Sequence, residues 1–151
     1  DRDKNNPACV FCEAVKQPDS PENLIIFRGK LAFVILNRYP YTSGHLMVVP
    51  YLHCKNLVDL PDETLLEMMQ LTQKAVSVLG QEYEPQGFNI GMNLGAVAGA
   101  GITEHLHMHV VPRWQGDANF VSVIGQTRVL PETLEETYHR MCEAWKRAST
   151  T

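Results

Sequence analysis

Alternating apolar and polar positions predict five short β-strands, most of them consecutive along the chain. The apolar runs lie at residues 24–28, 31–37, 45–49, 88–93 and 105–111. Gly29 and Lys30 separate the first two runs and favour an antiparallel hairpin. Pro50 ends the third run, because proline has no N–H to donate to a strand ladder. Consecutive strands joined by short turns indicate an antiparallel sheet.

Two further segments show the three- and four-residue spacing of an amphipathic helix. Residues 62–83 are the clearer one, with Asp62 and Glu63 in the first turn, where negative charge suits the helix dipole. Residues 131–145 predict the second helix. The expected apolar face of the first helix comprises Leu65, Met68, Met69, Thr72, Val76 and Leu79.

The pattern as a whole predicts one α+β domain over residues 1–151, with an antiparallel sheet of about five strands and two helices. The sequence contains no internal repeat, low-complexity segment or linker that would divide it. We expect residues 1–8 and 146–151 to be peripheral tails.

Composition narrows the class of protein. Apolar residues make up 44% of the chain and charged residues 20%, as in ordinary globular proteins. The formal net charge of −4 gives no general attraction to nucleic acid, so a bound phosphate would need local donors. No apolar run approaches the ~20 residues that span a bilayer, and the first stretch lacks the layout of a secretory signal. We therefore expect a cytoplasmic protein that binds neither nucleic acid nor membranes.

Three of the six histidines, His105, His107 and His109, alternate within one predicted strand. Alternate side chains of a strand share a face at a spacing of ~6.7 Å, so the three imidazoles would point one way. A largely neutral imidazole can attack phosphorus, and a neighbouring imidazolium can donate a proton to the phosphate. Arg113, just beyond the run, is a further candidate for phosphate contact. A solvated histidine face and a metal site with His-x-His spacing remain alternatives.

The four cysteines do not indicate a disulfide framework. The chain is large for a disulfide scaffold, and Cys9 and Cys12 have the C-x-x-C spacing of metal or redox sites. A pair of ordinary reduced thiols remains the alternative for these two. Cys54 and Cys142 have no such spacing, and we expect them to pack in the fold.

The run HLHMHVV at residues 105–111 matches the H-φ-H-φ-H-φ-φ signature, where φ is apolar, of the histidine triad (HIT) family. Residues 37–50 (NRYPYTSGHLMVVP) and 91–95 (GMNLG) are similar to two further conserved blocks of that family. The resemblance implies a HIT-like fold whose sheet continues across a homodimer. It also implies an enzyme that acts on nucleotides.

The resemblance implies roles for individual side chains. His107 would be the nucleophile that carries a nucleotide covalently, while His109 and His45 would complete a hydrogen-bonded cluster at the phosphate. The implied nucleotide-binding positions are Asn37 at the ribose, Asn93 near the scissile phosphate, and Ile35 and Phe33 in the base pocket.

A zinc site is also implied by the resemblance. Its ligands would be Cys9, Cys12, His53 and His105, as in the Cys₂His₂ sites of many HIT proteins. Four nitrogen and sulfur ligands that leave no open position make a structural site rather than a catalytic one. His105 would then serve the metal and not the substrate.

Within the family, residues 100–104 (AGITE) and 113–120 (RWQGDANF) resemble the bacterial diadenosine tetraphosphate phosphorylases. The hydrolase and phosphoramidase branches usually have Gly-Gln-Ser/Thr before the triad, where this chain has Gly101 and Ile102. We expect a transferase that passes a nucleotide from a dinucleoside polyphosphate to inorganic phosphate. A hydrolase or phosphoramidase of the same family is one alternative. A nucleotide-binding protein without activity is another.

Overall fold

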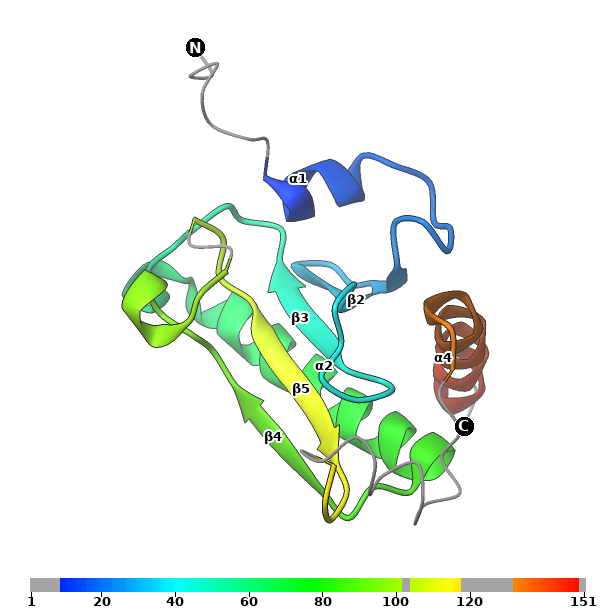
Figure 1. Cartoon of the computed structure of the whole chain (residues 1–151). Helices are drawn as coiled ribbons and strands as arrows, with labels where there is room; N and C mark the ends of the chain where they lie inside the picture. The colour runs from blue at the N-terminus through cyan, green and yellow to red at the C-terminus, as the bar shows by residue number, and fades with distance from the viewer. Residues whose placement is uncertain (1–8, 102–103, 118–131, 150–151) are drawn as a thin grey trace.

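The computed structural model describes residues 9–101, 104–117 and 132–149, in which five antiparallel strands and three α-helices form an α+β fold (Figure 1). The strands are β1 (Ile25–Arg28), β2 (Ala32–Leu36), β3 (Leu46–Pro50), β4 (Gly87–Gly91) and β5 (Met108–Arg113). The helices are α1 (Val10–Val15), α2 (Asp62–Tyr83) and α4 (Leu134–Ser149), with 3₁₀ turns at Leu57–Asp59 and Ala96–Ala98. The sheet order is β1-β2-β3-β5-β4, which confirms the predicted antiparallel sheet.

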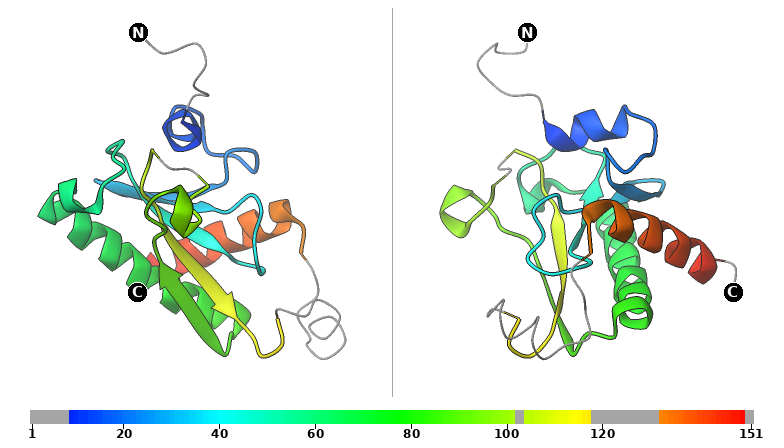
Figure 2. Two further views of the ribbon diagram at one scale, coloured as in Figure 1. Left: turned by 60° about the vertical axis from the view of Figure 1, so that its left-hand side comes forward. Right: turned by 45° about the vertical axis from the view of Figure 1, so that its right-hand side comes forward.

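One face of the sheet carries the hydrophobic core. Helix α2 packs against β2, β3 and β5, and α4 lies beside α2 and over β1 (Figure 2). Met68, Ala75 and Leu79 of α2 are fully buried against this face, and Trp145 of α4 stacks on Phe27 of β1 at 5.5 Å between ring centroids. None of the described helices has the length and apolar character needed to cross a membrane.

The opposite face of the sheet carries several of the residues that the sequence singled out. His109 of β5 is paired with Met47 of β3 on one side and Gly91 of β4 on the other, and Met47 is paired in turn with Ile35 of β2. Paired residues share a face, and residues two apart along a strand do too. The face opposite α2 therefore presents Ile35, Met47 and His109 in one row across the sheet.

Helix α2 confirms its predicted bounds but not the whole of its predicted apolar face. Leu65 is 37% exposed and Met69 is 52% exposed, whereas Leu71, Ala75 and Val78 are buried. The buried stripe is thus rotated from the predicted one, because apolar residues surround much of this helix and only the position of the sheet selects the inward face.

The ends of the chain also differ from the prediction. Helix α1, at the top of Figure 1, was not predicted, because six residues are too short to show a helical period. Helix α4 continues to Ser149, so residues 146–149 belong to the helix and are not a tail. Residues 1–8 lie outside the described part of the chain.

Strand β5 begins at Met108, three residues later than predicted. Before it, the Leu106 N–H donates to the Cys54 carbonyl at 2.8 Å instead of entering the sheet. His105 and His107 therefore precede the strand, and only His109 obeys the alternation on which the prediction was based.

Candidate active site

A cavity of about 930 Å³ opens on the face of the sheet opposite α2. Its walls are helix α1, the segment after β2, and the residues leading into β5. This volume lies within the range of small-molecule sites. Five of the residues predicted from the sequence line it, namely Ile35, Asn37, Asn93, His107 and His109, and His45 contacts His109 from behind.

His107 is held in a single tautomer by the backbone. Its Nδ1 lies 2.9 Å from the carbonyl oxygen of His105, which can only accept, so Nδ1 carries the proton and donates. The other ring nitrogen, Nε2, is left with its lone pair. His107 is 6% exposed and lines the cavity, so this unprotonated nitrogen belongs to a buried, nucleophilic imidazole.

His45 and His109 are joined by a hydrogen bond whose direction follows from the backbone. The backbone N–H of Tyr41 donates to His45 Nδ1 at 3.2 Å, which leaves the proton of His45 on Nε2. That Nε2–H donates to His109 Nδ1 at 2.9 Å, so the proton of His109 is on its own Nε2. The ring of His109 lies 4.8 Å from that of His107 between centroids. The cavity thus holds one imidazole with a free lone pair next to one with a free N–H.

Burial keeps these imidazoles neutral. Burial, and then the neighbouring His109 and His107, lower the pKa of His45 to about 4. Burial and then the adjacent His107 lower the pKa of His109 to about 4. Burial also lowers the pKa of His107, against the opposing effect of its hydrogen bond to His105. At neutral pH the cluster is uncharged, as a nitrogen nucleophile requires.

We expect the free energy of unfolding to fall as the pH drops from 6.5 toward 4. Unfolded imidazoles take up protons below their ordinary pKa of 6.5, while folded His45 and His109 resist protonation down to about 4. The stabilisation is therefore complete above pH 6.5 and is lost on acidification, by up to about 1.4 kcal/mol per pH unit for each imidazole. Urea unfolding at several pH values measures the slope.

The variant His45→Gln should reduce this slope, because it removes one of the two imidazoles. His139→Gln is the matched control, since His139 is an exposed histidine on α4, away from the cluster. Equal slopes for the wild type and His45→Gln would show that burial of His45 does not produce the pH dependence.

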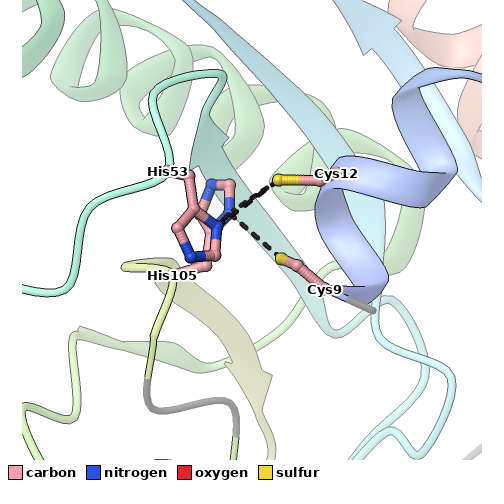
Figure 3. Close-up of side chains that lie close together, drawn as sticks. All are labelled: Cys9, Cys12, His53 and His105. Atoms are coloured by element: carbon pink, nitrogen blue, oxygen red, sulfur yellow. Dashed lines mark hydrogen bonds between the residues drawn. The ribbon is translucent and has the colours of Figure 1, made fainter. Parts of the chain in front are cut away.

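A second cluster lies beside the triad, where Cys9, Cys12, His53 and His105 converge (Figure 3). Nδ1 of His105 lies 3.3 Å from Cys9 Sγ, 3.6 Å from Cys12 Sγ and 3.2 Å from His53 Nδ1, and His53 Nδ1 is 3.4 Å from Cys12 Sγ. Zinc bonds of about 2.3 Å to sulfur and 2.0 Å to nitrogen separate tetrahedral ligand atoms by roughly 3.3–3.8 Å. The four atoms are therefore compatible with one tetrahedral zinc ion.

The orientation of His105 supports the same interpretation. Its Nε2 lies 2.7 Å from the Pro50 carbonyl oxygen and donates to it, which directs the unprotonated Nδ1 toward the two sulfurs. The arrangement is thus that of a ligand set that a cation completes.

The HIT domain family model matches residues 17–116, two thirds of the chain. The chain belongs to the histidine triad (HIT) family. AP-4-A phosphorylase of Mycobacterium tuberculosis is 48% identical to it over 149 residues, covering 97% of this chain and 76% of the relative. Adenosine 5'-monophosphoramidase HNT1 of Saccharomyces cerevisiae is 28% identical over 106 residues, covering 70% and 63%.

A solved structure shares the fold of this HIT protein. The crystal structure of a Zn-bound histidine triad family protein from Mycobacterium smegmatis aligns with a TM-score of 0.74 at 27% identity, covering 95% of this chain and 96% of that one. The agreement over nearly the whole length of both chains confirms the HIT fold.

Two predicted nucleotide contacts lie away from the cavity of this HIT protein. Phe33 is fully buried and packs on the Tyr51 ring at 5.3 Å, and it is not part of the lining. The Arg113 guanidinium is held by Asp117 at 2.6 and 2.7 Å and by Asn89 at 2.5 Å, beyond the far end of the triad. The structure therefore does not bring Phe33 and Arg113 together with the other candidates.

Two residues of the site were missed in the sequence. Phe11 of α1 packs its ring on both His105 and His107, at 5.3 and 5.1 Å between centroids, and thus joins the cysteine-histidine cluster to the triad. Its place between Cys9 and Cys12 was the available signal. Tyr41 stacks on His45 at 5.2 Å, and nothing in the local pattern distinguishes it from an ordinary turn residue.

Proposed function

We propose that this HIT protein is a nucleotidyl transferase that phosphorolyses dinucleoside polyphosphates, with diadenosine tetraphosphate as the expected substrate, through a nucleotide bound covalently to His107. The observation that carries the proposal is the complementary pair in the cavity: a lone pair on His107 Nε2 beside an N–H on His109 Nε2. The 48% identity to a protein named AP-4-A phosphorylase supports the choice of substrate and of phosphorolysis.

In the first step, His107 Nε2 attacks the α-phosphorus of one adenosine. An N–P bond forms, and the P–O bond to the remaining nucleoside triphosphate breaks. The Nε2–H of His109 donates to a phosphate oxygen and stabilises the charge that develops there. The hydrogen bond from Nδ1 of His107 to the His105 carbonyl orients the attacking ring and stabilises the charge it acquires.

In the second step, an oxygen of inorganic phosphate attacks the same phosphorus. The N–P bond breaks, His107 Nε2 recovers its lone pair, and ADP leaves. Water in place of phosphate would release AMP, so the acceptor alone separates a phosphorylase from a hydrolase on this scaffold. Covalent catalysis divides one difficult displacement into two easier ones.

The remaining lining residues account for binding of the first nucleoside. Ile35 and Met47 line the cavity with apolar side chains on which a base would lie. Asn37 also lines the cavity, and its side chain would contact the ribose. Asn93 lines the same cavity and would reach the phosphate region. We leave Phe33 and Arg113 out of this set, because neither lines the cavity.

We also propose that the cluster of Cys9, Cys12, His53 and His105 holds a structural zinc ion. With four protein ligands, such an ion would link α1 to the segment after β3 and to the segment before β5. It would have no open coordination position for a substrate. Cys9 precedes α1, Cys12 lies within it, and residues of α1 line the cavity. The zinc would therefore fix one wall of the nucleotide cavity. It requires reduced thiols, which is consistent with the proposed cytoplasmic location.

A homodimer is proposed as the assembled form. Strand β4 is an edge of the described sheet and Ile90 on it is 47% exposed, while α2 exposes Leu66 and Met69. An unpaired edge strand with exposed apolar neighbours is a favourable place for a second copy to continue the sheet. Sedimentation of wild type and Leu66→Arg tests this, with a monomeric wild type contradicting it.

The function is tested by incubating the protein with diadenosine tetraphosphate, with and without inorganic phosphate, and identifying the products. We expect ADP and ATP, formed only with phosphate. AMP and ATP formed without phosphate would replace the phosphorylase by a hydrolase. Tight binding of adenosine nucleotides with no turnover would contradict both and leave a binding protein.

A further inference from the structure

A second cavity, of about 490 Å³, lies next to the first on the same face of the sheet. Along β5, His109, Val111 and Arg113 alternate on this face, so the strand leads from the triad into the second cavity. Tyr41 lines both cavities and stands at the boundary between them. The second cavity is lined by Tyr41, Thr42, Asn89, Val111, Arg113 and Asp117.

We propose that this second cavity binds the second nucleoside of a dinucleoside polyphosphate, the half that leaves when His107 attacks. The inference rests on the proposed function, because only a substrate with two nucleosides needs two such places. A nucleoside held beyond His109 would keep the leaving polyphosphate in line with the attacking nitrogen of His107.

Tyr41 provides a stacking surface for this nucleoside. One face of its ring lies on His45, 5.2 Å away and nearly parallel at 14°. The residue is nevertheless 81% exposed, so none of the described residues covers the other face of the ring. Stacking between a base and an aromatic ring does not depend on which base is present. The second cavity would therefore accept a nucleoside with little preference for its base.

The far wall of the second cavity is formed by Arg113, Asp117 and Asn89, which are joined by hydrogen bonds. The Arg113 guanidinium is fixed by Asp117 and Asn89, yet its side chain remains 43% exposed. Because Asp117 balances its charge, Arg113 acts here as an oriented hydrogen-bond donor to the second nucleoside rather than as a phosphate clamp.

The length of the substrate fits this layout. Val111 lies two residues from His109, about 6.7 Å along the strand, and Arg113 about the same distance farther on. With the α-phosphorus at His107, the three remaining phosphates and a ribose extend beyond His109. These phosphates and the ribose need to span only the distance from His109 to Arg113 to place the second base beside Tyr41.

The first test compares two substrates that differ only in the second nucleoside. Diadenosine tetraphosphate and adenosine 5′-tetraphosphate have the same phosphate chain, and attack on either yields ADP when phosphate is the acceptor. We expect kcat/KM of the wild type to be about tenfold or more higher for the dinucleoside, as the loss of one stacked base implies. Equal values would overturn the second subsite while leaving the proposed function intact, and no turnover of either substrate would overturn both.

The second test fills the cavity. Asn89 is exposed on β4 and its side chain lines the second cavity, so Asn89→Trp places an indole there, away from the core. We expect the ratio of kcat/KM between the two substrates to fall toward one in this variant. Glu143→Trp, on the exposed side of α4, is the matched control and should keep the wild-type ratio.

An unchanged ratio in a folded Asn89→Trp variant, or an equal loss for both substrates, would contradict the assignment. The melting temperature shows whether the variant is folded, and sedimentation shows whether it keeps the wild-type assembly. The comparison in the wild type does not depend on any variant, so the second subsite remains testable if Asn89→Trp does not fold.

Discussion

The variant His107→Ala loses turnover of diadenosine tetraphosphate by about 10³-fold or more and still binds adenosine nucleotides. The loss is large because the substitution removes the atom that forms the covalent bond, and the neighbouring His109 presents an N–H to the cavity instead of a lone pair. Binding persists because Ile35, Met47 and Asn37 are untouched. Product formation measures the first effect, and calorimetric titration with AMP measures the second.

The control for this variant is His139→Ala, which removes an exposed histidine of α4 and should leave turnover unchanged. Intact-mass measurement adds an independent readout, since wild type incubated with substrate but without phosphate should gain one adenylyl group and His107→Ala should not. Near-normal turnover by His107→Ala would remove His107 as the nucleophile. Lost binding with lost turnover would make its role structural.

The residues of the triad could be found in the sequence, but the reason for their alignment could not. Alternation in a strand predicted that His105, His107 and His109 share a face, yet β5 begins only at Met108. The ring of Phe11 packs on the rings of both His105 and His107. This contact, and not the alternation of a strand, positions the two imidazoles. That packing depends on a six-residue helix with no period of its own, so local patterns could not reveal it.

The limits of α2 were predictable and its orientation was not. An acidic first turn and a long apolar period fixed the helix at residues 62–83. Its inward face depends on where the sheet lies, which local sequence does not encode. Exposed Leu66 and Met69 are then explained by the proposed second copy rather than by the core of one chain.

The proposed metal ligands show what a family resemblance can predict that the spacing of residues cannot. Cys9 and Cys12 alone indicated only a metal or redox pair, whereas the resemblance supplied His53 and His105. The structure brings the four together although Cys9 and His105 are 96 positions apart. Phe33 and Arg113 show the opposite outcome: a plausible residue type near the motif does not fix where the side chain lies.

Replacing Cys12 by serine should release the metal, lower the stability and weaken nucleotide binding together. Cys12 is the ligand within α1, so without it α1 loses its link to the two histidine ligands. The helix keeps the packing of Phe11 and the hydrogen bonds from Asn23 and Arg28 to its last carbonyls. Loss of a closed zinc site costs several kcal/mol, which corresponds to a fall in melting temperature of about 10 °C for a domain of this size. Binding weakens because α1 lines the cavity.

Metal analysis of protein purified without chelator should find about one zinc per wild-type chain and much less in Cys12→Ser. A chelator should then lower the melting temperature of the wild type and leave that of Cys12→Ser nearly unchanged, because that variant has no bound metal to lose. Cys142→Ser on α4 is the control that should keep both the metal and the response to chelator. Wild type with well under one equivalent of zinc, and no response to chelator, would contradict the zinc site but leave His107 and His109 in place. The two proposals therefore stand or fall separately, although Phe11 joins their clusters.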